Sequence, residues 1–128
     1  MENLLTTETQ SHREMYSFNR NILSGIILDC SIEVHKHLGH GLLESVYELC
    51  LCEELARRKV NFKRQVYRPI IYKEKELEAD FRIDILVEDE VIIELKSVEK
   101  ILPVHQAQLL SYLKLADKKL GVLLMFLN

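Results

Sequence analysis

The stretch RIDILVEDEVIIELK, residues 82–96, constrains the fold more than any other part of the chain. Two apolar, β-branched runs flank three consecutive acidic residues, a pattern that predicts a β-hairpin with its turn at residues 88–90. Three further charged residues, Asp84, Glu94 and Lys96, lie inside the apolar runs rather than in the turn. Their position raises the question of what holds charged side chains within the strands.

Side chains alternate between the two faces of a strand, so Glu94 and Lys96 are expected to share a face. The length of the turn decides whether Asp84 joins them. A three-residue loop would set Asp84 opposite Glu94, whereas a two-residue loop would put Asp84 on the other face. No Asn-Gly or Asp-Gly dipeptide decides between the two. With the longer loop, two carboxylates would face each other, a like-charge pairing that destabilises a sheet.

A divalent cation would offset that repulsion. Hard ions such as Mg²⁺ and Mn²⁺ take carboxylate oxygens as ligands and leave positions open for water and phosphate. Lys96 beside such an ion could act as a base or orient a water molecule. The alternative is a solvated hairpin face, on which Glu94 and Lys96 alternate with apolar neighbours.

The rest of the chain predicts a domain with both helices and strands. Apolar residues at three- and four-residue steps predict amphipathic helices over residues 21–38, 43–59 and 104–116. β-Branched and aromatic runs predict strands within residues 60–68, 69–87, 91–98 and 121–127. Pro69 favours a sheet edge or a strand start, and the polar residues 1–18 suggest a loose arm or a short helix. This order is that of an α/β or α+β domain whose sheet is largely antiparallel in its first part.

Composition excludes several other classes of protein. At 128 residues, 48% of them apolar and 29% charged, the chain is the size of one globular domain, which we place at residues 19–128. We expect neither a membrane span nor a signal peptide, because no long uncharged apolar stretch occurs. Cys30, Cys50 and Cys52 lack CxxC spacing and predict free thiols in the reducing cytoplasm.

The net charge of −3 hides a basic block from Ala56 to Lys73, which holds seven Lys or Arg residues and no acidic residue. Acidic segments flank this block on both sides. Such an arrangement could seat a polyanion next to a cation-dependent centre. Alternatively, the block is simply a solvated helix end and strand edge, where Lys and Arg residues are common. The candidate nucleic-acid-binding residues are Arg57, Arg58, Lys59, Lys63, Arg64 and Arg68.

Four motifs resemble those of a known superfamily. Asp84, Glu94 and Lys96 resemble the D…(D/E)xK signature of the PD-(D/E)XK nuclease superfamily. The segments VHKHLGHGLLESVYE, RIDILVEDEVIIELKSV and HQAQLLSYLKL are similar to the GxxExxY family within it. The naming motif of that family stands here as Gly41, Glu44 and Tyr47. The resemblance runs from about Ile22 to the C-terminus.

The resemblance implies a restriction-endonuclease-like core, with a central mixed sheet flanked by helices. It implies Mg²⁺ or Mn²⁺ as cofactor and, as metal ligands, Asp84, Glu94 and Glu44. Lys96 would be the catalytic lysine. Gln108 and Tyr112 match a QxxxY element of one nuclease branch, and their i, i+4 spacing puts them on one helical side, where they would orient Lys96 or contact a phosphate.

Three functions follow as alternatives. The leading one is a metal-dependent nuclease acting on DNA or, as a second choice, RNA, with a homodimer or a protein partner as a possible working form. A second is a non-catalytic module that retains the nuclease fold and binds nucleic acid or protein. A third is a structural subunit that binds neither metal nor nucleic acid.

Overall fold

A five-stranded sheet and three helices make up the computed structural model of the protein, which describes residues 4–10, 18–100 and 102–127. The elements in chain order are β1 (Leu4–Gln10), α1 (Phe18–Leu38), α2 (Glu44–Arg57), β2 (Phe62–Tyr72), β3 (Lys75–Val87), β4 (Val91–Val98), α3 (Pro103–Ala116) and β5 (Leu120–Leu127). The strand order in the sheet is β1-β5-β4-β3-β2, with β4 and β5 parallel and all other neighbours antiparallel. This mixed sheet flanked by helices confirms the predicted fold class.

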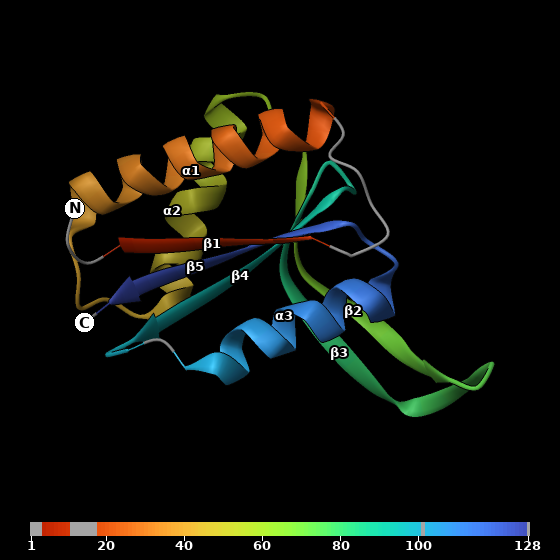
Figure 1. Cartoon of the computed structure of the whole chain (residues 1–128). Coiled ribbons are helices and arrows are strands. Elements are labelled where there is room, and N and C mark those ends of the chain that lie inside the picture. Colours follow the sequence, from red (N-terminus) through yellow and green to blue (C-terminus); the bar gives the residue numbers. More distant parts are fainter. Residues whose placement is uncertain (1–3, 11–17, 101, 128) are drawn as a thin grey trace.

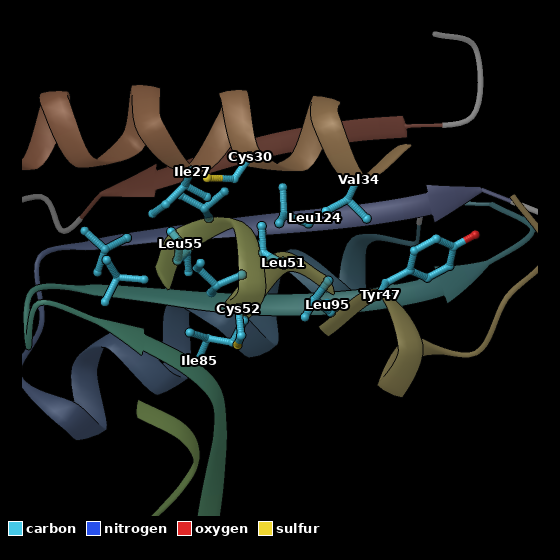
Figure 2. Packing of buried hydrophobic residues seen from close by; sticks show 14 of the residues in the cluster. Ile27, Cys30, Val34, Tyr47, Leu51, Cys52, Leu55, Ile85, Leu95 and Leu124 are labelled. Carbon is cyan, nitrogen blue, oxygen red and sulfur yellow. The ribbon is translucent and has the colours of Figure 1, made fainter. Parts of the chain in front are cut away.

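The helices cover the sheet from both sides (Figure 1). Helices α1 and α2 pack against one face, where Leu51 and Leu55 of α2 are fully buried beside Ile27 of α1 (Figure 2). Helix α3 covers the other face with Leu109 and Leu113. Each such leucine stabilises the fold by about 1.5–3 kcal/mol through its burial. Within the described residues, no helix is both long enough and apolar enough to cross a membrane.

The loop between α1 and α2 brings the start of α2 to the sheet. Helix α1 ends at Leu38, before Gly39, whose φ of +71° suits a glycine and whose N–H donates to the His35 carbonyl at 2.8 Å. Gly41 also has a positive φ, of +90°, as its place in the loop requires. Helix α2 then begins with Glu44, an acidic residue in the first turn, where the helix dipole favours negative charge.

The first strand corrects the prediction for the N-terminus. Residues Leu4–Gln10 form β1, an edge strand antiparallel to β5, and not a loose arm or a short helix. Gln10 lies opposite Leu120, so the two partners come from opposite ends of the chain. The rest of that predicted arm, residues 1–3 and 11–17, lies outside the described residues.

The edge of the sheet opposite β1 is strand β2, which forms a long hairpin with β3, and the far end of this hairpin extends past α3 (Figure 1). The chain turns at Lys73 and Glu74, which have φ values of +49° and +68°. Strand β2 passes through Pro69, and the sheet tolerates this proline because β2 is an edge strand, as predicted.

Candidate metal-dependent active site

A three-residue turn joins β3 to β4, which is the longer of the two loops considered from the sequence. Val87 lies opposite Val91, and the pairing extends to Ile85 opposite Ile93. Continued by one step, this register would set Asp84 across from Glu94, but the regular pairing ends at Ile85. The turn has the length that the predicted site requires, whereas the position of Asp84 depends on the strand beyond the regular pairing.

Beyond Ile85, carboxylates form hydrogen bonds between the two strands. The Asp84 N–H donates to Glu94 Oε1 at 3.3 Å, and the Leu95 N–H donates to Asp84 Oδ2 at 2.9 Å. Both acidic side chains are only 4% exposed. The backbone donors offset part of the cost of burying these polar groups.

The two carboxylates do not leave their strands on one regular face, which corrects the predicted arrangement. Ile83 packs under α3 while Ile85 packs under α1 and α2, although residues two apart in a regular strand share a face. The alternation of β3 therefore changes at Asp84, next to the irregular β2 residue Gln65, whose φ is +51°. Asp84 lines a cavity on the α2 side of the sheet.

Strand β4 keeps its alternation past the same point. Leu95 packs with the α1 and α2 core and Ile92 with the α3 core, so Glu94 and Lys96 leave β4 on the α3 side. Asp84 and Glu94 consequently meet across the gap between β3 and β4, through the hydrogen bonds that each makes to the other strand. Lys96 is half-buried, and its charge acts on Glu94.

Burial raises the pKa of Glu94 to about 8, with a further contribution from the charge of Asp84. The Asp84 N–H and the charges of Lys96 and Arg82 act in the opposite direction but do not outweigh burial. A cation near this pair would relieve the repulsion between the two carboxylates. The donor set fits a hard divalent ion, because Mg²⁺ binds through one or two carboxylates and keeps several water ligands. Across the described part of the chain, no group of three or more His, Cys, Asp or Glu residues gathers as a metal site.

A solvent-open cavity of about 670 Å³ lies between the start of α2 and strands β2, β3 and β4. Its charged and polar wall includes Glu44, Glu48, Arg64, Gln65, Arg82 and Asp84. The cavity joins the candidate ligand Asp84 to two guanidinium groups. Such a wall suits an anionic ligand better than an apolar one.

Two ion pairs line this cavity. Arg82 Nη2 lies 3.1 Å from Asp84 Oδ1, and Arg64 contacts Glu48 Oε2 through Nη2 at 2.7 Å and Nε at 3.0 Å. Gln65 Nε2 donates to the second oxygen of Glu48 at 2.8 Å. Partial burial lowers the pKa of the Arg82 guanidinium, but the charges of Asp84 and Glu94 outweigh burial, so that this pKa is raised.

Sequence reasoning missed Arg82 and Glu48. Arg82 precedes Asp84 by two positions, the spacing that puts two strand residues on one face. Glu48 follows Glu44 by four positions, which puts both carboxylates on one side of α2. Both signals were present in the sequence, although neither shows which cation each carboxylate would meet.

Tyr47 is the motif residue that anchors the connection between α1 and α2. The Tyr47 hydroxyl donates to the Gly39 carbonyl at 2.9 Å and accepts from the Leu42 N–H at 3.3 Å. Its ring stacks on Phe126 of β5, with centroids 3.9 Å apart. Tyr47 therefore holds the loop that contains Gly41 against the sheet. Figure 2 shows the ring at the edge of the buried cluster, with its hydroxyl directed outward.

Glu44 lies on the cavity wall but its carboxylate is already engaged. The Ser97 N–H donates to Glu44 Oε1 at 3.0 Å, and the Ser97 hydroxyl donates to the Leu42 carbonyl at 2.9 Å. These bonds tie the start of α2 to the end of β4. A role of Glu44 as a metal ligand stays a prediction.

The predicted α3 pair is joined internally. Gln108 Nε2 donates to the Tyr112 hydroxyl at 2.8 Å, and the Tyr112 ring packs against Phe81 with centroids 5.2 Å apart. His105 accepts the Leu102 N–H at 3.2 Å and so caps the first turn of α3. The predicted contact of Gln108 or Tyr112 with Lys96 or a phosphate stays a prediction.

The predicted basic residues lie in two places, at the C-terminal end of α2 and on strand β2. Arg57, Arg58 and Lys59 are exposed around the C-terminal end of α2, and Arg57 pairs with Glu53 at 2.9 Å. At 1.5 Å per residue, that end lies about 20 Å from Glu44 at the start of the helix. Lys63 and Arg68 are exposed on β2, whereas Arg64 lines the cavity. Of the six, Arg64 has a place in the site itself.

Comparison with known proteins gives one match. A family model described as the PD-(D/E)XK nuclease superfamily matches residues 21–128, whereas the searches of curated proteins and of solved structures found no match. Nucleases of this superfamily act on nucleic acid and generally use divalent metal ions. The matched region contains every element from α2 to β5, together with the paired carboxylates and the cavity beside them. The chain belongs to the PD-(D/E)XK nuclease superfamily.

Proposed function

We propose that this protein is a metal-dependent nuclease that hydrolyses phosphodiester bonds in DNA, with RNA as the second choice of substrate. The observation that carries the proposal is the buried pair Asp84 and Glu94, whose first member opens onto a cavity containing Arg64 and Arg82. Paired carboxylates and guanidinium groups are the side chains that metal-assisted phosphoryl chemistry requires.

The roles of the site residues follow from the superfamily signature and from the hydrogen bonds that join Asp84 and Glu94 to each other's strands. Asp84 and Glu94 would hold Mg²⁺ or Mn²⁺, and Glu44 would add a ligand through a bound water from the cavity wall. When bound, the cation would polarise the scissile phosphate and lower the pKa of a coordinated water. Lys96, whose charge acts on Glu94, would orient that water or accept its proton.

The arginines of the cavity would bind phosphates next to the cleaved bond. Arg64 is oriented by its two contacts to Glu48, which leaves a guanidinium edge for an anion in the cavity. The exposed cations Lys63 and Arg68 on β2, and Arg57–Lys59 at the end of α2, would contact more distant phosphates. Contacts of this kind position a nucleic acid without reading its sequence.

Within the superfamily, we assign the chain to the GxxExxY family. The motif residues support this assignment because Gly41 and Glu44 line the cavity, and the Tyr47 hydroxyl bonds Gly39 and Leu42 on either side of Gly41. Gln108 and Tyr112 would assist from α3, where they contact each other. Free thiols at Cys30, Cys50 and Cys52 support a cytoplasmic location. A homodimer or a protein partner as the working form stays a prediction.

Cleavage of labelled oligonucleotides by the purified protein tests the proposal. Single-stranded DNA, duplex DNA and RNA are each incubated with Mg²⁺, with Mn²⁺ or with a chelator. We expect cation-dependent cleavage that Asp84→Asn, Glu94→Gln and Lys96→Gln each abolish. Lys118→Gln serves as control, because Lys118 pairs with Asp89 at the β3–β4 turn and not in the cavity.

Equal residual cleavage in all variants would point to a contaminant and defeat the assignment. Calorimetry with Mn²⁺ separates the remaining alternatives. Binding of nucleic acid without uptake of Mn²⁺ would indicate the non-catalytic module instead. Absence of both would indicate the structural subunit.

A further inference from the structure

Both oxygens of the Asp84 carboxylate are engaged within the protein. Oδ2 accepts the Leu95 N–H at 2.9 Å, and Oδ1 accepts Arg82 Nη2 at 3.1 Å. Each oxygen keeps a further lone pair, but a guanidinium at this distance repels any second cation near Oδ1. Asp84 must therefore lose a partner before it becomes a good ligand for a divalent ion.

The two partners differ in how readily they leave. The Leu95 N–H belongs to a strand residue that is 1% exposed, where a donor that loses its acceptor finds no water. The Arg82 side chain is 49% exposed and lines the cavity. Its charge remains solvated when it turns away, because about half of the side chain is already in contact with water. Arg82 is consequently the partner that moves.

Arg82 is held less firmly than Arg64, the other arginine that lines the cavity. Arg64 is held by two hydrogen bonds to Glu48, which is 4% exposed. Arg82 contacts Asp84 through one nitrogen, so it is the less constrained cation. Its planar guanidinium suits a tetrahedral phosphate oxyanion, which it binds through two parallel N–H groups.

We propose that Arg82 is a positioning residue that passes from Asp84 to a backbone phosphate of the nucleic acid, and thereby frees Asp84 for the divalent cation when substrate occupies the cavity. The inference rests on the proposed nuclease function. Arg82 acts as a substitute cation for Asp84 until substrate arrives. It also holds the carboxylate in place through this contact.

This exchange makes the binding of cation and nucleic acid interdependent. Substrate that withdraws Arg82 raises the affinity of Asp84 for the cation, and by linkage the cation raises the affinity for substrate by the same factor. Without Arg82, the two ligands would lose most of this coupling. The coupling is therefore a quantity that separates a positioning role of Arg82 from a purely structural one.

The test is calorimetric titration of the full chain with Mn²⁺, with and without a saturating single-stranded oligonucleotide whose phosphorothioate backbone resists hydrolysis. In the wild type, we expect the oligonucleotide to tighten Mn²⁺ binding by at least about fivefold, the lower end of typical coupling. In Arg82→Gln, Mn²⁺ should bind more tightly without oligonucleotide, and the oligonucleotide should change that affinity by less than about twofold. The same variant should bind the oligonucleotide more weakly.

Two further variants serve as controls for Arg82→Gln. Lys118→Gln removes the same charge from a pair with Asp89 at the β3–β4 turn and should keep the wild-type coupling. Arg82→Lys retains a cation at the position and should restore part of the coupling, which also covers the case of a Gln variant that does not fold.

The outcomes distinguish this inference from the proposed function. A wild-type protein that takes up no Mn²⁺, or whose uptake is unchanged in Asp84→Asn, overturns both. A wild type that binds Mn²⁺ equally well with and without oligonucleotide overturns the role of Arg82 alone. The same conclusion follows if Arg82→Gln keeps the full coupling.

Discussion

Glu94 accepts a hydrogen bond from the backbone N–H of Asp84, while the Asp84 carboxylate accepts the N–H of Leu95, next to Glu94. Each of the two candidate ligands thus also links β3 to β4 where the regular pairing stops. Substitutions at these positions affect stability as well as chemistry. Isosteric amides and alanine are therefore expected to behave differently.

Asp84→Asn should remove Mn²⁺ binding but keep most of the stability, because the amide oxygen still accepts the Leu95 N–H. Asp84→Ala should lose metal binding and also lower the free energy of unfolding by about 1–3 kcal/mol, since it leaves a buried donor without an acceptor. Urea unfolding in the presence of a chelator measures the difference. Equal stability of the two variants would contradict the linking role of this carboxylate.

Glu94 makes the stability of the chelator-treated protein depend on pH. Its folded pKa of about 8 exceeds the ordinary value of 4.5, so the folded state holds a proton that the unfolded chain releases between these values. The stability that this bound proton gives to the folded state is complete below pH 4.5 and is lost as the pH rises through about 8. The charged groups that act on Glu94 are Asp84, Lys96 and Arg82. Glu94→Gln should flatten this pH dependence and make the protein more stable at pH 8 than the wild type.

Urea midpoints at pH 5, 6, 7 and 8 measure that slope in both proteins. Added Mn²⁺ should stabilise the wild type at pH 8, because binding to the folded state adds to its stability. The Gln variant should not respond to the cation. A wild-type slope that persists in Glu94→Gln would assign the titration to another group.

Glu44→Gln separates the two tasks of this residue. The amide oxygen can still accept the Ser97 N–H, so the stability should stay close to that of the wild type. If Glu44 contributes a ligand through water, Mn²⁺ affinity should fall, but by less than in Asp84→Asn. Glu44→Ala, which also removes the acceptor, should lower the unfolding free energy by about 1 kcal/mol or more. Unchanged Mn²⁺ affinity in Glu44→Gln would restrict Glu44 to its structural contact.

Tyr47→Phe should loosen the loop between α1 and α2. The variant keeps the stacked ring but loses the hydroxyl that bonds the Gly39 carbonyl and the Leu42 N–H, at a cost of about 1–2 kcal/mol. Amide hydrogen exchange of residues 39–43 should accelerate more than exchange elsewhere. Tyr67→Phe is the matched control, because Tyr67 is 61% exposed and its loss of a hydroxyl should leave that loop unchanged.

Gly121→Ala should destabilise the fold at the contact between α3 and β5. A Cβ at this position would lie 2.8 Å from Leu109 Cδ1, and Leu109 is fully buried. Such overpacking costs about 1–3 kcal/mol. Gly25→Ala in α1 meets no atom within 4 Å and should instead stabilise by about 0.4–1 kcal/mol. Thermal unfolding of both variants tests the pair, and a stable Gly121→Ala would show that α3 can shift.

Local sequence patterns predicted most of the secondary structure. Three kinds of local signal each act within a few residues: the apolar periodicity of α1 and α2, the glycines at positions 39 and 41, and the proline at the start of α3. The three helices and the β2–β4 region were therefore found from the sequence. Strand β1 was missed because its seven polar and apolar residues pair only with β5, at the other end of the chain. A local pattern does not reveal such a distant partner.

The candidate site divides in the same way. Alternation in β4 predicted that Glu94 and Lys96 share a face, whereas the turn length and the place of Asp84 stayed open, and the resemblance to the superfamily signature brought the three together. Tertiary structure decided how they meet, because the alternation of β3 changes at Asp84 and turns its carboxylate toward Arg82 and the cavity. That change lies beside the irregular residue Gln65 of the neighbouring edge strand, which pairs with β3 only in the folded chain. The identity of the acidic pair is a property of the sequence, whereas its burial, the raised pKa of Glu94 and the guanidinium at Asp84 arise when three strands and a helix exclude water from one place.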